Sequence, residues 1–230
     1  MTETLLLAVI LVPCLIIAIV FHEVAHGWIA LALGDPTAKE QKRLSLNPIR
    51  HVDPIGTLLV PGALALFGGP IFGWAKPVPV RGDRLRNPRY GMVAVAAAGP
   101  GTNLVLALVG ALLFGTVSGV IIAGGGTPPE WLLTAGGMFI LINVFLALFN
   151  LLPIPPFDGS HIVGGLLPRK WAVSWQKFQS LGMLFFIVLI AATWAFPNSG
   201  LLENTVLEPV LWLQARYFEL ADWIARGIAG

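Results

Sequence analysis

The stretch that decides the fold runs from Leu5 to Leu33 and reads LLLAVILVPCLIIAIVFHEVAHGWIALAL. Its first 17 residues, Leu5 to Phe21, are apolar without interruption. A helix needs about 20 mostly apolar residues to cross the hydrocarbon core of a bilayer, so the pattern predicts a membrane-spanning helix over residues 5–33. The polar residues inside this span are costly there and by default indicate a function; they are His22, Glu23 and His26.

The composition of the whole chain agrees with a membrane protein. Of its 230 residues, 56% are hydrophobic and only 11% are charged, whereas a soluble domain carries about 25% charged residues. These values exclude an ordinary soluble protein, a disordered protein and a nucleic-acid binder, whose basic surface needs more charge. Cys14 is the only cysteine, so the chain forms no internal disulfide and no cysteine-rich metal site.

Three further charge-free stretches predict spans over residues 91–122, 131–152 and 178–197. Together with the first span they predict an all-α polytopic membrane protein with about four transmembrane helices. We expect residues 1–200 to form an intramembrane core. Residues 201–230 mix apolar and charged side chains, which predicts an amphipathic C-terminal helix that lies on the membrane or pairs with a second copy.

The polar stretch 34–90 holds nine of the 14 Lys and Arg residues. Basic residues favour the cytoplasmic side, so we expect this stretch in the cytoplasm. Within it, residues 54–75 carry no charge but eight Gly and Pro, which predicts a re-entrant or interfacial segment rather than a span. We also expect short extended strands near residues 42–80, because the alternate residues Pro77 and Pro79 do not allow a helix.

The polar residues of the first span form the pattern His22-Glu23-Val24-Ala25-His26. Residues four apart share one face of a helix, so both imidazoles can bind the same metal ion. Glu23 lies on the same turn and can act as a general base. This HExxH pattern is typical of zinc metalloproteases, whose zinc takes three protein ligands and keeps one open position.

The third ligand is not local, because Ala32 stands six residues after the motif, where some zinc proteases have a histidine. Topology favours Asp158, because the first and third spans both run towards the cytoplasm and Asp158 follows the third. Its carboxylate is then expected on the same side of the membrane as the two histidines. The alternative for Asp158 is a plain Asp-Gly turn at the interface. The other candidate ligands are Asp35, Glu40, His51, Asp53 and His161.

For several other polar residues and glycines we expect structural roles. For His51 and Asp53 we expect a turn before Pro54, although both could line the cytosolic entrance to the site. Asn103 and Asn143 fit hydrogen bonds between helices. For the pair of glycines around Pro100, Gly99 and Gly101, we expect a kink or close packing.

Three stretches together resemble the site-2 protease family of intramembrane zinc metalloproteases: the HExxH motif, residues 98–103 (AGPGTN), and Asn150-Leu151-Leu152-Pro153 with Asp158-Gly159. Residues 47–57 and 73–80 are similar to small bacterial members of the family without a PDZ domain. The resemblance implies one zinc ion per chain, held by His22, His26 and Asp158. It also implies Glu23 as the base, and Asn150 as the residue that holds the substrate carbonyl or the oxyanion.

The same resemblance implies an intramembrane endopeptidase in the bacterial inner membrane, with its active site towards the cytoplasm. Its partners would be the lipid bilayer and a transmembrane substrate, such as a membrane-bound anti-sigma factor, cut in regulated intramembrane proteolysis. A competing hypothesis is a metal-ion transporter or channel that uses the same His and Asp cluster. No inverted repeat supports it, and Glu23 has no obvious role in transport. An inactive scaffold is a third hypothesis, which the intact motif argues against.

Overall fold

The computed structural model describes residues 3–60, 73–182 and 203–230, together with residues 63, 66, 184, 187, 188, 191 and 192. Within these residues all regular elements are helices, which confirms the predicted all-helical class. Only half of the predicted fourth span, residues 178–197, lies within the described residues, so this span stays a prediction. The predicted re-entrant segment, residues 54–75, is likewise described only in part, because residues 61, 62, 64, 65 and 67–72 lie outside the described residues.

In the part of the chain that the structure describes, three helices are long and apolar enough to cross a membrane: α1 (Glu3–Ala32), α4 (Pro88–Ala123) and α5 (Glu130–Asn150). They confirm the first three predicted spans. Only 28–33% of each most apolar window is buried inside the protein. Most of these apolar side chains therefore face outward, as they do when lipid rather than water surrounds the helices. The protein is an integral membrane protein.

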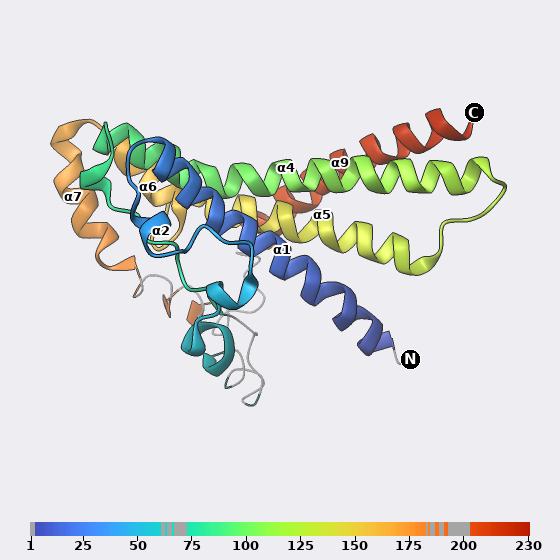
Figure 1. The fold of residues 1–230 in the computed structure, drawn as a ribbon, viewed down its shortest axis with the longest axis horizontal. Coiled ribbons are helices and arrows are strands. Elements are labelled where there is room, and N and C mark those ends of the chain that lie inside the picture. Colours follow the sequence, from blue (N-terminus) through green and yellow to red (C-terminus); the bar gives the residue numbers. More distant parts are fainter. Residues whose placement is uncertain are drawn as a thin grey trace.

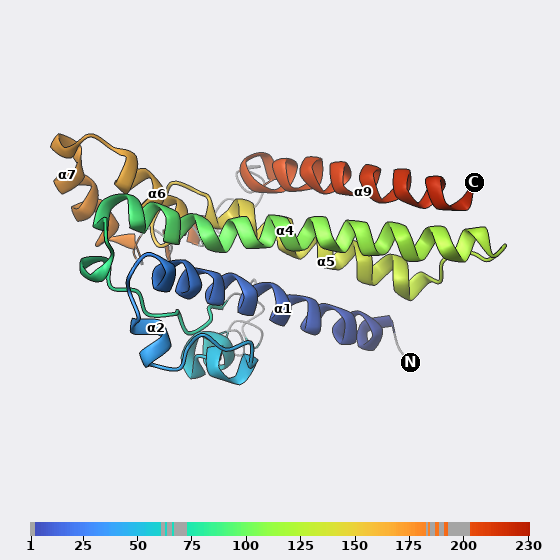
Figure 2. The ribbon, with the colours of Figure 1, turned by 45° about the horizontal axis from the view of Figure 1, so that its top comes forward.

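The helix α4 is the central element of the molecule. It packs against α1, α5 and the last helix, α9 (Glu208–Ala229), and the four helices run alongside one another (Figures 1 and 2). Asn87 begins α4, because its side chain accepts the backbone N–H of Tyr90 and Pro88 takes the first helical position. Both chain termini and the α4–α5 connection lie at one end of the molecule.

The opposite end holds the short elements that surround the polar residues of α1 (Figures 1 and 2). Two helices follow α5 there, α6 (Asp158–Leu166) and α7 (Arg169–Gln179). The long connection between α1 and α4 contains α2, η1, η2 and η3, with bounds Thr37–Glu40, Pro48–His51, Pro54–Leu59 and Gly82–Arg84. A single turn, η4 (Glu203–Leu207), precedes α9.

The prediction of short strands near residues 42–80 is wrong for the described part of that range, where no strand forms. Residues 73–80 follow an irregular path without helix. The backbone N–H groups of Trp74, Lys76 and Val78 donate to three separate acceptors: the carbonyls of Gly56 and His51 and the carboxylate of Glu23. No single neighbouring strand supplies these partners, and Pro77 and Pro79 have no N–H to add to a ladder.

The predicted tail helix is present as α9, and its buried side chains contact the chain's own α4 and α5. Val210 joins a core cluster with Ala107 and Ile140. Tyr217 donates its hydroxyl to the carbonyl of Leu104 at 3.1 Å. This intramolecular partner was not among the predicted ones, the membrane surface and a second copy.

Candidate metal centre

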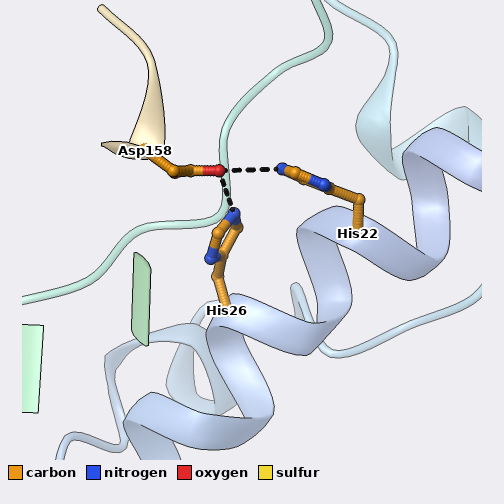
Figure 3. A group of neighbouring side chains, drawn as sticks. All are labelled: His22, His26 and Asp158. Atoms are coloured by element: carbon orange, nitrogen blue, oxygen red, sulfur yellow. Dashed lines mark ion pairs between the residues drawn. The ribbon is translucent and has the colours of Figure 1, made fainter. Parts of the chain in front are cut away.

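Three side chains from two distant parts of the chain converge between α1 and α6 (Figure 3). Asp158 Oδ2 lies 3.2 Å from Nε2 of His22 and 3.4 Å from Nε2 of His26. The three potential ligand atoms all lie within 4.8 Å of one another. Of the predicted ligands, the structure therefore brings His22, His26 and Asp158 together.

The helical repeat of α1 explains the placement of the two histidines. Residues four apart lie one turn above each other, and the rings of His22 and His26 stand 4.7 Å apart at an interplanar angle of 85°. Both side chains are buried, with exposed fractions of 7% and 9%. A pair of imidazoles in an apolar helix bundle needs polar partners, and each ring has one on α4.

Asp158 is the first residue of α6 and follows the turn that ends α5. The turn is tight: a Cβ atom on Gly159 would stand 2.2 Å from the carbonyl oxygen of Leu151. A side chain at position 159 would therefore push α6 away from the end of α5. The first turn of a helix also stabilises a carboxylate through its free N–H groups.

The hydrogen bonds on the far side of each ring fix which nitrogen carries the proton. Nδ1 of His26 lies 2.7 Å from the carbonyl oxygen of Val95, which can only accept. Nδ1 of His22 lies 2.6 Å from Oδ1 of Asn103. Each Nδ1 therefore donates, and each neutral ring presents an unprotonated Nε2 to the site, as a metal-binding histidine must.

With these tautomers, three lone-pair atoms face one another without a proton between them. The buried Oδ2 of Asp158 accordingly has no hydrogen-bond partner, although it is close to both Nε2 atoms. Tetrahedral zinc with ligand distances near 2.1 Å separates neighbouring ligand atoms by about 3.4 Å. The measured 3.2 and 3.4 Å agree with that spacing. The donor set thus fits a zinc ion.

A glycine of α4 leaves room for such an ion. A Cβ atom built on Gly99 would lie 2.5 Å from Nε2 of His26 and 2.6 Å from Nε2 of His22. No side chain can occupy this position while both histidines keep their orientation. The space beside the two nitrogen atoms exists because residue 99 has no Cβ.

The predicted base, Glu23, is tied to the connection between α1 and α4. Its Oε2 accepts the backbone N–H of Val78 at 2.8 Å. Val78 is buried and also packs close to Gly27 of α1. This contact holds the carboxylate beside the HExxH turn and links it to the segment 73–80.

Asn150 is the last residue of α5, and its Nδ2 donates to the carbonyl of Leu146 at 2.9 Å within its own helix. Its predicted role at the substrate carbonyl therefore stays a prediction.

The remaining candidate ligands lie outside the cluster. Asp53 caps η2 by accepting the N–H groups of Ile55 and Gly56, and His51 is buried with Nε2 at 2.7 Å from the carbonyl of Ser45. Both positions agree with a structural role. Asp35 holds Thr37 and Arg81, Glu40 pairs with Arg84, and the exposed His161 lies near Gln179.

Three groups that contact the centre had no predicted role in the site. Asn103 was predicted to join helices, which the structure confirms, but it also contacts His22. Gly99 was predicted to allow a kink or close packing, and the side chains that pack against it are those of His22 and His26. The Val95 carbonyl gives no signal in sequence. The sequence signal for this set is its spacing: Val95, Gly99 and Asn103 recur every four residues and so share one face of α4.

Buried histidines and a carboxylate beside a glutamate, enclosed by membrane helices, define the class of membrane-embedded metalloproteases. Comparison with known proteins agrees with this class. The sequence model of peptidase family M50 matches residues 116–192, which include Asp158. The chain belongs to peptidase family M50, the site-2 protease family.

Three relatives illustrate the similarity. The chain is 36% identical over 217 residues to YwhC of Bacillus subtilis, provisionally named a zinc metalloprotease, with 87% of this chain and 94% of YwhC covered. It is 31% identical over 157 residues to MJ0611 of Methanocaldococcus jannaschii, with 67% and 68% covered. Rip2 of Mycolicibacterium smegmatis is 28% identical over 177 residues, with 76% and 64% covered. MJ0611 and Rip2 are, like YwhC, provisionally named zinc metalloproteases. No solved structure matches the chain.

Proposed function

We propose that the protein is an intramembrane zinc endopeptidase that hydrolyses peptide bonds in or near transmembrane segments of membrane-protein substrates. One observation carries the proposal: the Nε2 atoms of His22 and His26 and Oδ2 of Asp158 converge at distances that suit one zinc ion. The proposed core is residues 1–200, with residues 201–230 as a supporting tail.

The roles of the residues follow from this arrangement. Zinc, when bound, supplies a Lewis acid that polarises the peptide carbonyl and acidifies water. Glu23 accepts a proton from the attacking water and returns it to the leaving amine. Its Oε2 accepts the N–H of Val78, which leaves Oε1 without that donor and available for the proton. Burial of the site by apolar helices keeps the dielectric low and strengthens each of these interactions.

For Asn150 we propose a role at the oxyanion, which requires its amide to leave the carbonyl of Leu146 when substrate arrives. Catalytic hydrogen bonds are often incomplete without substrate. An Nδ2 donor beside the reacting carbonyl would stabilise the negative charge that develops on oxygen.

The segment 73–80 is proposed to bind an unwound stretch of substrate, because a helical substrate hides its carbonyls in its own hydrogen bonds. Part of the segment's backbone is already used, since the N–H groups of Trp74, Lys76 and Val78 donate to other parts of the protein. The residues between and after them, Ala75, Pro77 and Pro79, carry three carbonyls but only one N–H, because proline has none. A substrate strand paired there would mainly donate hydrogen bonds.

The proposed orientation places the metal centre towards the cytoplasm in a bacterial inner membrane. The connection between α1 and α4, which carries eight of the 14 basic residues, lies at the same end as the site. Membrane-bound regulators such as anti-sigma factors are the proposed substrates. The proposed orientation rests on the distribution of basic residues, and the proposed substrates rest on the family.

The testing experiment compares the purified wild-type protein with the Glu23→Gln variant. Bound zinc is measured by metal analysis, and cleavage of a transmembrane peptide by mass spectrometry. We expect both proteins to hold zinc and only the wild type to cleave, because Gln keeps the shape of Glu23 but cannot accept the proton. Cleavage that is unaffected by the substitution would refute the proposal. Zinc flux into vesicles that contain the Glu23→Gln variant would favour the transporter alternative.

A further inference from the structure

A chain of two side-chain amides connects the metal centre with α5. Nδ1 of His22 contacts Oδ1 of Asn103, and Nδ2 of Asn103 lies 2.9 Å from Oδ1 of Asn143. Nδ2 of Asn103 also reaches the carbonyl of Ala18 at 3.1 Å, and Nδ2 of Asn143 reaches the carbonyl of Phe139 at 2.9 Å. Both asparagines are completely buried.

The direction of every hydrogen bond in this chain is fixed by its two backbone carbonyls. The carbonyl of Phe139 can only accept, so the amide nitrogen of Asn143 faces it and the amide oxygen faces Asn103. The carbonyl of Ala18 can only accept as well, and together with Asn143 it takes both protons of the Asn103 amide nitrogen. Turning either amide over would set donor against donor or oxygen against oxygen.

The only group left to face His22 is the amide oxygen of Asn103. That oxygen accepts, so Nδ1 of His22 must donate and Nε2 keeps its lone pair. We propose that Asn103 is a positioning residue that selects the metal-binding tautomer of His22, and that Asn143 keeps Asn103 in the required orientation. This rests on the proposed zinc site and adds the part of it that lies on α4 and α5.

The same face of α4 serves both histidines. The carbonyl of Val95 sets the tautomer of His26, Gly99 leaves the space beside both Nε2 atoms, and Asn103 sets the tautomer of His22. α4 therefore holds both ligands in register without supplying one itself. Such outer partners commonly change metal affinity about 10- to 100-fold when they are lost.

The experiment compares two substitutions with opposite expectations. Asn103→Leu has a similar volume but no acceptor, whereas Asn103→Asp introduces a buried charge but keeps an acceptor for His22. If Asn103 sets the tautomer, zinc affinity measured by chelator competition falls about 10- to 100-fold in the Leu variant and less in the Asp variant. If Asn103 only packs, the Leu variant keeps its affinity and the Asp variant is the damaged one. The control is Ser118→Ala, which alters a buried polar residue of the same helix away from the site.

A second measurement reports the tautomer directly. The chain has four histidines, so ¹⁵N-histidine labelling gives few signals, and the zinc-free protein can be compared with each variant. We expect Nδ1 of His22 to carry the proton in the wild type and in the Asp variant, and the tautomer to change or mix in the Leu variant. If the Leu variant does not fold, the Asp variant decides: folded protein with an unchanged His22 tautomer supports the inference, and an altered tautomer overturns it.

The outcomes separate this inference from the proposed function. A wild-type protein that binds no zinc refutes the proposed function. A wild type that binds zinc together with a Leu variant of equal affinity and equal tautomer refutes the positioning role alone.

Discussion

At the scale of single residues, the metal centre depends on the absence of a Cβ atom at Gly99. Gly99 faces both ligand nitrogens, and a Cβ there would stand 2.5–2.6 Å from them. Two residues along the same helix, a Cβ on Gly101 would have no atom within 4 Å. Two glycines around one proline thus differ completely in what they permit, although the sequence shows them as equivalent.

The substitution Gly99→Ala is therefore expected to abolish zinc binding without unfolding the protein. Alanine favours a helix over glycine by about 0.5–1 kcal/mol, so the helix itself does not suffer, while the methyl group displaces both imidazoles from the ion. Metal analysis of purified protein should find zinc in the wild type and in the Gly101→Ala control, but not in the Gly99→Ala variant. Full zinc occupancy in Gly99→Ala would show that the ligand atoms lie elsewhere.

At the scale of elements, the connection between α1 and α4 is held against the helices by a few buried polar contacts. Asp35 is fully buried and accepts hydrogen bonds from Thr37 and from the backbone N–H of Arg81 at 2.6 Å. It thereby joins the end of α1 to the residues that follow segment 73–80. The same segment carries the N–H that holds Glu23, so the position of the proposed base depends on this attachment.

The pKa of Asp35 supports a pH-dependence of this attachment. Burial alone would raise the pKa of Asp35, but the hydrogen bonds from Thr37 and Arg81, with the nearby charge of Arg84, lower it below the usual 3.8. A lowered pKa means that the ionised carboxylate stabilises the fold fully above pH 3.8, and that this stabilisation is lost as the pH falls below that value.

We expect Asp35→Asn to destabilise the protein at neutral pH by about 1–3 kcal/mol, because an amide sets a donor against a buried donor. Thermal unfolding in detergent should show a lower midpoint for the variant at pH 7, with a difference that shrinks below pH 3.8. The control is Asp83→Asn in the same connection, whose ion pair with Arg81 is exposed and should matter little. Equal midpoints for all three proteins at pH 7 would contradict the assigned role of Asp35.

At the scale of the whole molecule, α9 completes the helix bundle. It approaches α4 so closely that a Cβ on Gly115 would lie 2.4 Å from the carbonyl oxygen of Ala221, and one on Gly119 would lie 2.9 Å from Ala225. Small residues on both helices allow this contact between backbones, as they do in other membrane helix pairs. Four of the charged residues of α9 form exposed pairs, Arg216 with Glu219 and Arg226 with Asp222.

The substitution Gly115→Ala should loosen α9 from the bundle, since over-packing a close contact costs about 1–3 kcal/mol. Limited trypsin digestion in detergent reports this at Arg216 and Arg226, where cleavage should become faster than in the wild type. Gly227→Ala is the matched control, because a Cβ there has no neighbour within 4 Å. An unchanged digestion rate in Gly115→Ala would show that α9 does not depend on this contact.

Much of the fold could be predicted from the sequence because lipid imposes a simple rule. A segment that crosses a bilayer must be apolar and must satisfy its own backbone hydrogen bonds. The charge-free stretches therefore predicted α1, α4 and α5 directly. The strands near residues 42–80 were predicted from the prolines of one segment. The backbone partners of that segment proved to be scattered acceptors, and no local pattern indicates such partners.

The sequence by itself determined the membrane helices, the two histidines on one face of α1 and, through helix direction, that Asp158 belongs at the same end. These features follow from local periodicity and from the cost of polar groups in lipid. Only the tertiary structure decided which atoms face one another: Asn103 behind His22, the Val95 carbonyl behind His26, Gly99 beside both, and Val78 at Glu23. Such contacts join residues 55 to 81 positions apart, and they depend on how the helices turn and approach, which no pattern within a single helix specifies.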